Sequence, residues 1–106
     1  MKHAITIAVR YAAVRRQFSN TEGEPEQQIL NYATHEYRLM PLLAAAYALH
    51  FTSMRLQSLF TESKERSMND DFSLLKDLHT TAAGLKPICT WLTHYAIDEC
   101  RQVRFI

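Results

Sequence analysis

The chain has 106 residues and a formal net charge of +1, so it is long enough for one modest core and offers no electrostatic basis for binding nucleic acid or an anionic membrane. Its two glycines and three prolines are too few for a β-sandwich or a glycine-rich phosphate loop. Helix-forming residues dominate, which predicts an all-α chain, and the longest apolar run, 42–49, is far shorter than the ~20 residues that a membrane span needs.

The first predicted helix runs from about residue 2 to 18. Large side chains recur at helical spacing along its predicted buried seam: Ile7, Tyr11, Val14 and Phe18. A neighbouring row widens the apolar face: Ala4, Ile5, Ala8, Val9 and Ala12. Residues 19–25 include Asn, Gly and Pro and are expected to form a loop. The first twenty residues carry basic side chains and no acidic one, which is also typical of a mitochondrial presequence.

The second predicted helix runs from about residue 26 to 63. Its main apolar seam consists of Ile29, Ala33, Tyr37, Met40, Ala44, Tyr47 and Phe51. A second seam consists of Leu39, Leu43 and Ala46. Pro41 lies inside this pattern, and because it removes a backbone donor we expect it to kink the helix or to mark a short break. Residues 61–71 are polar and charged and are expected to form a frayed helix end and a loop.

The third predicted helix runs from about residue 71 to 104, with Asp70 or Asp71 as its N-cap and a kink at Pro87. Its apolar positions alternate intervals of three and four residues, as in helical bundles: Leu75, Leu78, Ala82, Leu85, Cys89, Leu92, Ala96 and Val103. Three long helices with wide apolar stripes need a fourth partner. The sequence therefore predicts one partial domain, an up-and-down bundle of three helices that lacks its fourth.

No catalytic or metal-binding residue is predicted. The five histidines (His3, His35, His50, His79 and His94) show no metal-ligand spacing, and each is interpreted as a surface histidine or as a core histidine with satisfied hydrogen bonds. Cys89 and Cys100 lie in one predicted helix, roughly 16 Å apart at 1.5 Å per residue, which is beyond disulfide reach. We therefore expect a reducing compartment.

Two groups of residues leave a functional alternative open. The aromatic residues fit the core of a bundle, and the alternative is the wall of a planar-cofactor or acyl-chain site: Tyr37, Tyr47, Phe51, Phe60, Trp91 and Tyr95. The cluster Arg15-Arg16-Gln17-Phe18 ends an apolar helix, where cations favour the negative end of the helix dipole. The alternative is a dinucleotide contact, because arginine donates paired hydrogen bonds to a pyrophosphate and phenylalanine packs on a ring.

Four segments, in order, resemble the acyl-CoA oxidases, which share the acyl-CoA dehydrogenase-like fold. "HAITIAVRYAAVRRQF" resembles the family helix that ends in an RRQFG-type motif, and "ILNYATHEYRLMPLLAAAYALHF" resembles the next helix, including the internal Pro41. "DFSLLKDLHTTAAGLKPICTW" resembles the following helix, and "AIDECR" the stretch before a CGGHGY-type loop. The likeness runs to Arg101 and makes a presequence a poor interpretation.

The resemblance implies FAD as cofactor. It assigns Arg15 to the flavin phosphates across a subunit interface, and it brings Gln17 and Phe18 close to the flavin. Ser19 stands where the family has glycine, and Ala33 where it often has glutamine. His35 and Glu36 also replace amides that are usual in the family.

By resemblance, the chain is expected to be a C-terminal helical fragment of a peroxisomal acyl-CoA oxidase, which oxidises acyl-CoA to trans-2-enoyl-CoA with peroxide release in fatty-acid β-oxidation. The family's catalytic glutamate belongs to a later YEG-type motif, so the fragment is expected to be inactive alone and to self-associate, whereas the whole protein forms a homodimer. The alternative is a non-enzymatic helical dimerisation or regulatory module. We expect the ends of the chain to reflect a truncated gene model or a retained intron.

Overall fold

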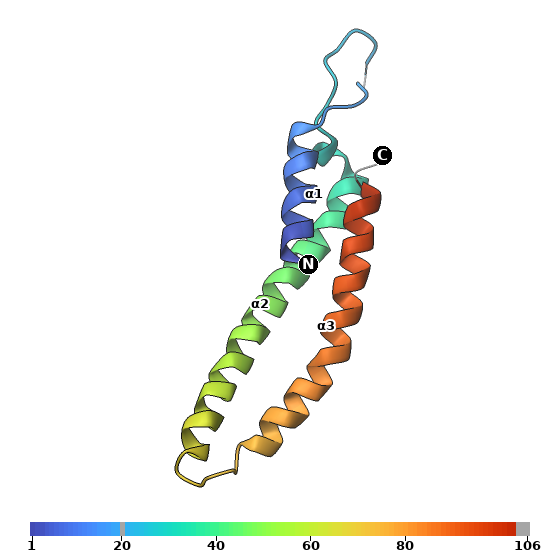
Figure 1. Ribbon diagram of the computed structural model, residues 1–106. Coiled ribbons are helices and arrows are strands. Elements are labelled where there is room, and N and C mark those ends of the chain that lie inside the picture. Colours follow the sequence, from blue (N-terminus) through green and yellow to red (C-terminus); the bar gives the residue numbers. More distant parts are fainter. Residues whose placement is uncertain (20, 104–106) are drawn as a thin grey trace. The chain divides into compact units, whose positions relative to one another are not determined.

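The computed structural model describes residues 1–19 and 21–103, and this part of the chain is helical (Figure 1). In chain order it contains α1 (Lys2–Val14), the short 3₁₀ helix η1 (Ile29–Asn31), α2 (Ala33–Ser67) and α3 (Leu75–Val103). The prediction of an all-α chain with three long helices is confirmed. The predicted helix end at Arg104 lies outside the described residues.

The chain divides into two compact units. The core unit contains Met1–Ala46 and the chain from Thr93 onward, that is, α1, η1, the first part of α2 and the last part of α3. The hairpin unit contains Tyr47–Leu92, that is, the rest of α2, the turn and the first part of α3.

The core unit holds the hydrophobic core, whose buried members are Ile5, Ala8, Ala12, Ile29, Leu39, Leu42, Ala46, Ala96, Cys100 and Val103. Alanine supplies three of these positions along α1 and α2, and it allows close packing without loss of rotamer freedom. On α1 the predicted main seam is wrong, because Ile7 and Val14 are exposed. The buried face is instead the neighbouring row that includes Ile5, Ala8 and Ala12.

The buried face of α2 is likewise the second predicted seam rather than the first. Leu39 and Ala46 are buried as that seam requires, whereas Tyr37 is 82% exposed and Met40 is 40% exposed. On α3 the predicted seam is buried or half-buried at every position except Leu75. Both apolar stripes of α2 follow helical spacing, but only the stripe that contains Leu39 and Ala46 faces the core.

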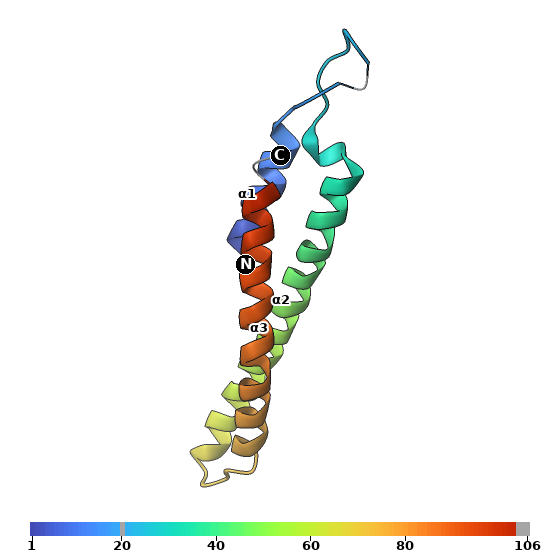
Figure 2. The same ribbon diagram turned by 90° about the vertical axis from the view of Figure 1, so that its right-hand side faces the viewer.

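The hairpin unit consists of two antiparallel helical segments that lie side by side in both views (Figures 1 and 2). Leucines from both segments are half-buried between them: Leu56, Leu59, Leu78 and Leu85. The prediction that the aromatic residues form a bundle core is wrong for this chain, because each of them is more than half exposed: Tyr37, Tyr47, Phe51, Phe60, Trp91 and Tyr95. For the four that belong to the hairpin unit, Tyr47, Phe51, Phe60 and Trp91, burial in a two-helix unit extends only to the facing stripe, which they do not occupy. Tyr37 and Tyr95 belong to the core unit and lie outside its buried face.

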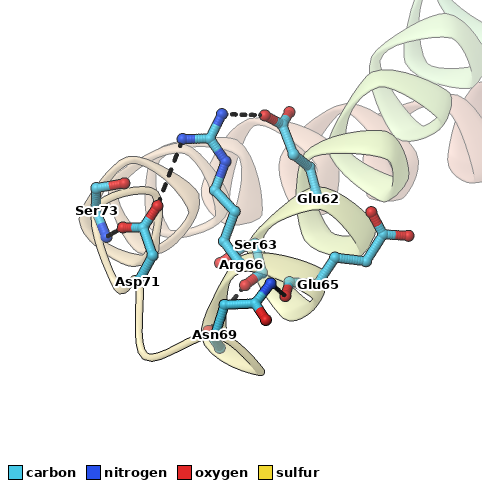
Figure 3. Close-up of polar contacts among 8 residues, drawn as sticks. Glu62, Ser63, Glu65, Arg66, Asn69, Asp71 and Ser73 are labelled. Atoms are coloured by element: carbon cyan, nitrogen blue, oxygen red, sulfur yellow. Dashed lines mark hydrogen bonds and ion pairs between the residues drawn. The ribbon is translucent and has the colours of Figure 1, made fainter.

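The turn between α2 and α3 is held by Arg66, whose guanidinium lies 2.6 Å from Glu62 and 3.8 Å from Asp71 (Figure 3). The ion pair with Glu62 and the basic residues of the last turn stabilise the C-terminal end of α2. The helix therefore continues to Ser67 instead of ending at residue 63. Asp71, which lies four residues before the start of α3, accepts a hydrogen bond from the backbone N–H of Ser73. Asp71 thus stabilises the turn, and because α3 begins only at Leu75, the prediction that Asp70 or Asp71 caps it is wrong.

Neither internal proline interrupts its helix. Pro41 lies inside α2 and Pro87 inside α3, and both side chains are exposed. A proline in a helix interior loses one backbone hydrogen bond, and a long helix tolerates this loss when the packing on its buried face continues on both sides. A break at Pro41, one of the two alternatives predicted there, does not occur, because α2 continues through it.

Candidate functional site

The segment after α1 forms a short antiparallel ladder with the segment before η1. A backbone bridge joins Arg16 to Gln28. Three backbone hydrogen bonds of 2.9 Å surround it: Gln17 N–H to Gln27 O, Gln27 N–H to Phe18 O, and Ile29 N–H to Arg15 O. The cluster Arg15–Phe18 therefore belongs to this ladder, with Arg15 in an extended conformation, and is not the last turn of a helix as predicted from the sequence.

The loop composition explains why α1 ends at Val14. Gly23 has a φ of 92°, a conformation that glycine adopts without strain, and Pro25 follows it. The chain can therefore reverse direction, and the ladder satisfies the backbone groups that a longer helix would have satisfied. Arg15 lies directly after the helix, and its N–H closes the last turn on Tyr11 O at 2.8 Å.

Phe18 has a left-handed backbone conformation with a φ of 59°. A bulky residue rarely adopts this conformation, which costs about 1–2 kcal/mol, so the surrounding contacts must hold it. Its carbonyl oxygen accepts the Gln27 N–H and lies 3.4 Å from the hydroxyl of Tyr32. The same hydroxyl donates to the Gln17 carbonyl oxygen at 2.8 Å. Tyr32 therefore fixes the backbone of Gln17 and Phe18, two of the three residues that the resemblance assigns to the flavin.

A hollow of about 200 Å³ opens beside this strained turn. It lies entirely within the core unit, and its walls come from the ladder, η1 and the start of α2: Gln17, Phe18, Ile29, Tyr32, Thr34 and His35. Ligand pockets for drug-sized molecules usually have volumes of about 300–1,000 Å³, so this hollow has room for one part of a larger ligand. Phe18 itself is 64% exposed, and an exposed aromatic ring at a hollow can pack against another ring.

His35 is the unusual residue of the hollow. Its side chain is buried, with 3% exposure, and its Nε2 atom has no hydrogen-bond partner among the described residues. Burial lowers the pKa of its imidazole, and the nearby positive charge of Arg38 lowers this pKa further, so the ring is neutral near pH 7. The interpretation of His35 as a surface histidine or a satisfied core histidine is therefore wrong.

The two arginines of the cluster have different surroundings. The Arg16 guanidinium donates to the Glu26 carbonyl oxygen at 3.0 Å, across the ladder. The Arg15 side chain is exposed and has no hydrogen bond or ion pair with another described residue. Arg15 is therefore a free cation next to the hollow, although it does not line it.

Two of the residues that the resemblance assigns to the flavin lie at this hollow, and their role there stays a prediction. Gln17 and Phe18 line the hollow together, whereas the resemblance did not assign Tyr32, Thr34 or His35 to it. These three residues lie near the start of the second family-like segment, and their polar side chains at or just before the start of α2 were the available signal. Their contact with the ladder depends on the chain reversal at 19–25, which spacing alone does not reveal.

The rest of the described chain offers few other groups for chemistry. No group of three or more potential metal ligands occurs among residues 1–19 and 21–103. In the same residues, no helix has the length and apolar character needed to cross a membrane. Both cysteines are free, and burial raises the pKa of the Cys100 thiol. The hairpin unit has an open groove of about 530 Å³, which is mainly apolar and is lined by Ser53, Leu56, Gln57, Phe60, Leu75, Leu78, His79 and Ala82.

Comparison with known proteins identifies the family. The family model described as the acyl-CoA oxidase C-alpha1 domain matches residues 1–104. This chain belongs to the acyl-CoA oxidase family. A rat relative named peroxisomal acyl-coenzyme A oxidase 1 is 45% identical over 102 residues, an alignment that covers 96% of this chain and 15% of the relative.

Solved structures of acyl-CoA oxidases agree with the fold. The tomato enzyme is 44% identical, with a TM-score of 0.85 over 95% of this chain and 15% of that chain. Acyl-CoA oxidase-1 of Caenorhabditis elegans, solved in complex with FAD and ATP, is 36% identical, with a TM-score of 0.87 over 96% of this chain and 16% of that chain. The chain therefore spans about one sixth of the length of the acyl-CoA oxidases that it matches.

Proposed function

We propose that this chain is a flavin-contacting helical segment of a peroxisomal acyl-CoA oxidase. One observation carries the proposal: Gln17 and Phe18, which the family motif assigns to the cofactor, line one hollow together with the unpartnered His35. Family membership supports FAD as the cofactor, and the Caenorhabditis elegans relative was solved with FAD bound. The name of the rat relative supports a peroxisomal location.

The residues present fit a dinucleotide. The exposed Arg15 guanidinium can donate to a phosphate, for which arginine has suitable fork geometry. The exposed ring of Phe18 can pack against a planar ring system, and the hollow beside it takes a group of limited size. In a homodimer, which we propose for the whole protein, Arg15 would meet the cofactor across the subunit interface.

The reaction proposed for the whole protein is the oxidation of acyl-CoA to trans-2-enoyl-CoA in fatty-acid β-oxidation. Bound flavin supplies hydride acceptance from the acyl β-carbon and electron transfer to dioxygen, which gives hydrogen peroxide. The α-proton requires a positioned carboxylate base, which the family carries in a motif outside these residues. We therefore assign cofactor contacts, and no catalytic residue, to the 106 residues, which we expect to be inactive alone.

A replacement experiment tests this proposal. The 102 matched residues of the rat relative are exchanged for those of this chain, and the purified protein is assayed for flavin absorbance and acyl-CoA-dependent peroxide. We expect the replacement protein to contain bound flavin and to release measurable peroxide. We expect the isolated chain to release no peroxide. A replacement protein that is folded and dimeric but contains no flavin would contradict the proposal.

A non-enzymatic helical dimerisation module is the second candidate, and one observation favours it. Large apolar side chains are exposed along the hairpin unit, among them Phe51, Phe60 and Trp91. Exposed apolar side chains of this kind commonly mark surfaces that bind another protein. In that case the replacement protein would assemble normally but would neither retain flavin nor release peroxide.

A further inference from the structure

His35 has a polar atom that the fold leaves unsatisfied. The residue is 3% exposed, and Nε2 has no hydrogen-bond partner among the described residues. A buried polar atom without a partner destabilises the folded state, because it has lost its hydrogen bond to water and gained none in return. An apolar side chain of similar size would avoid that penalty, so the presence of histidine here needs a reason.

The surroundings of His35 keep its ring neutral. Arg38 lies on the next turn of α2, and together with burial it lowers the pKa of the imidazole. A neutral imidazole has one donor nitrogen and one acceptor nitrogen, so it suits a neutral partner that can accept or donate a hydrogen bond. The guanidinium of Arg38 is itself paired with Glu99 at 2.8 Å and does not compete for that role.

The hollow beside His35 suits a flat group. Phe18 and Tyr32 contribute aromatic rings to its walls, and the hydroxyl of Tyr32 is already engaged by the Gln17 backbone. The hollow has about 200 Å³, enough for one ring system and too little for a complete dinucleotide. The imidazole torsion about Cβ–Cγ has a broad energy minimum, so a small turn of the ring can bring Nε2 to a group in the hollow.

We propose that His35 is a ligand-positioning residue, which hydrogen-bonds the edge of a planar nitrogen heterocycle that enters the hollow beside Phe18. The inference rests on the proposed function, because a flavin dinucleotide carries two such ring systems, an isoalloxazine and an adenine. His35 then contributes to binding at a cost in the stability of the ligand-free chain.

The test uses the purified 106-residue chain and two separate probes, FMN for the isoalloxazine and ADP for the adenine. His35→Leu removes the polar atom, and His35→Gln restores a polar group of similar reach. His79→Leu is the matched control, since His79 lines a groove in the hairpin unit but is exposed. Thermal unfolding of each variant is measured without ligand, and the affinity of each probe is measured by isothermal titration calorimetry. In the wild-type chain, NMR shifts of the His35 ring nitrogens report whether the imidazole contacts the probe.

We expect His35→Leu to raise the Tm of the ligand-free chain by about 4–8 °C and to weaken binding of one probe about tenfold. His35→Gln should retain most of the affinity, and His79→Leu should change neither quantity. A response to FMN alone identifies the isoalloxazine as the occupant, and a response to ADP alone identifies the adenine.

Three outcomes overturn the inference. His35→Leu could lower the Tm, as truncation of an ordinary core residue does, or it could leave the affinity for both probes unchanged. The third is a wild-type chain that binds neither probe at millimolar concentration. None of these outcomes decides the proposed function, which the replacement experiment with the rat relative tests separately.

Discussion

The guanidinium of Arg38 is hydrogen-bonded to the carboxylate of Glu99, with 2.8 Å between Nε and Oε2. Arg38 is near the start of α2 and Glu99 is near the end of α3, so this ion pair joins two parts of the core unit that are far apart in sequence. A second nitrogen of Arg38 donates to the Gln102 side-chain oxygen at 3.0 Å. Both partners of the ion pair are largely shielded from solvent, which distinguishes it from the exposed pairs of this chain.

The first prediction concerns this ion pair. Arg38→Ala should lower the free energy of unfolding by about 1–2 kcal/mol, because it removes charge-assisted hydrogen bonds and leaves Glu99 without its partner. Arg66→Ala is the control, since the Arg66 guanidinium pairs with Glu62 at the surface. Urea unfolding followed by circular dichroism measures both, and equal losses would show that burial does not strengthen the Arg38 pair.

The second prediction distinguishes the two apolar seams of α2. Leu39 is fully buried and its neighbour Met40 is 40% exposed, although the sequence places both on plausible apolar stripes. Leu39→Ala should lower the unfolding free energy by about 2–5 kcal/mol, and Met40→Ala by less than about 1 kcal/mol. The reverse order would mean that the main seam predicted from the sequence is the buried one.

These two residues also show what the sequence could reveal. Helical periodicity predicted the three helices, and the intervals along α3 predicted its inward face, because only one stripe on that helix is continuous. On α2 two stripes satisfy the same spacing, and the sequence cannot say which one meets a partner. The larger aromatic side chains favoured the wrong stripe, which is exposed in this chain.

The site was predictable to a similar extent. The family motif led to Gln17 and Phe18 from the sequence, but the extended ladder that holds them depends on pairing with residues 27–29. Such pairing is a tertiary contact and overrides the helical preference of the segment. The role proposed for His35 depends on its burial and on its unpartnered Nε2 atom, which only the structure reveals.

The third prediction is a pH dependence of stability. Burial lowers the pKa of His35 below its ordinary value of about 6.5, so the unfolded chain binds this proton more tightly than the folded chain. Stability should therefore fall as the pH drops through about 6.5, and this contribution should stop growing below the lowered folded-state pKa. Urea unfolding at about pH 7.5 and about pH 5.5 measures the loss, which should be smaller in His35→Leu. An identical loss in both proteins would show that His35 does not titrate in this way.

The fourth prediction is self-association of the isolated chain. Exposed Phe51, Phe60 and Trp91 leave apolar surface in water at a cost of roughly 25 cal/mol per Å². Size-exclusion chromatography with light scattering should show dimers or larger species, and Trp91→Lys should shift the chain towards monomer. If the chain stays monomeric and unfolds cooperatively at every protein concentration, the exposed aromatic side chains do not drive self-association.

The central claim, a cofactor contact at the end of α1, is tested most directly by the retention of flavin in the replacement protein made with the rat relative. Arg15→Ala should weaken the binding of flavin at least about tenfold, because a hydrogen bond to a charged group contributes about 1.5–3 kcal/mol. The control is Arg10→Ala, which removes an exposed cation from the middle of α1. After extensive dialysis, we expect the Arg15→Ala protein to have lost most of its flavin absorbance and the Arg10→Ala protein to have kept it. Equal flavin occupancy in the two variants would contradict the account and leave Arg15 as a residue at the end of a helix.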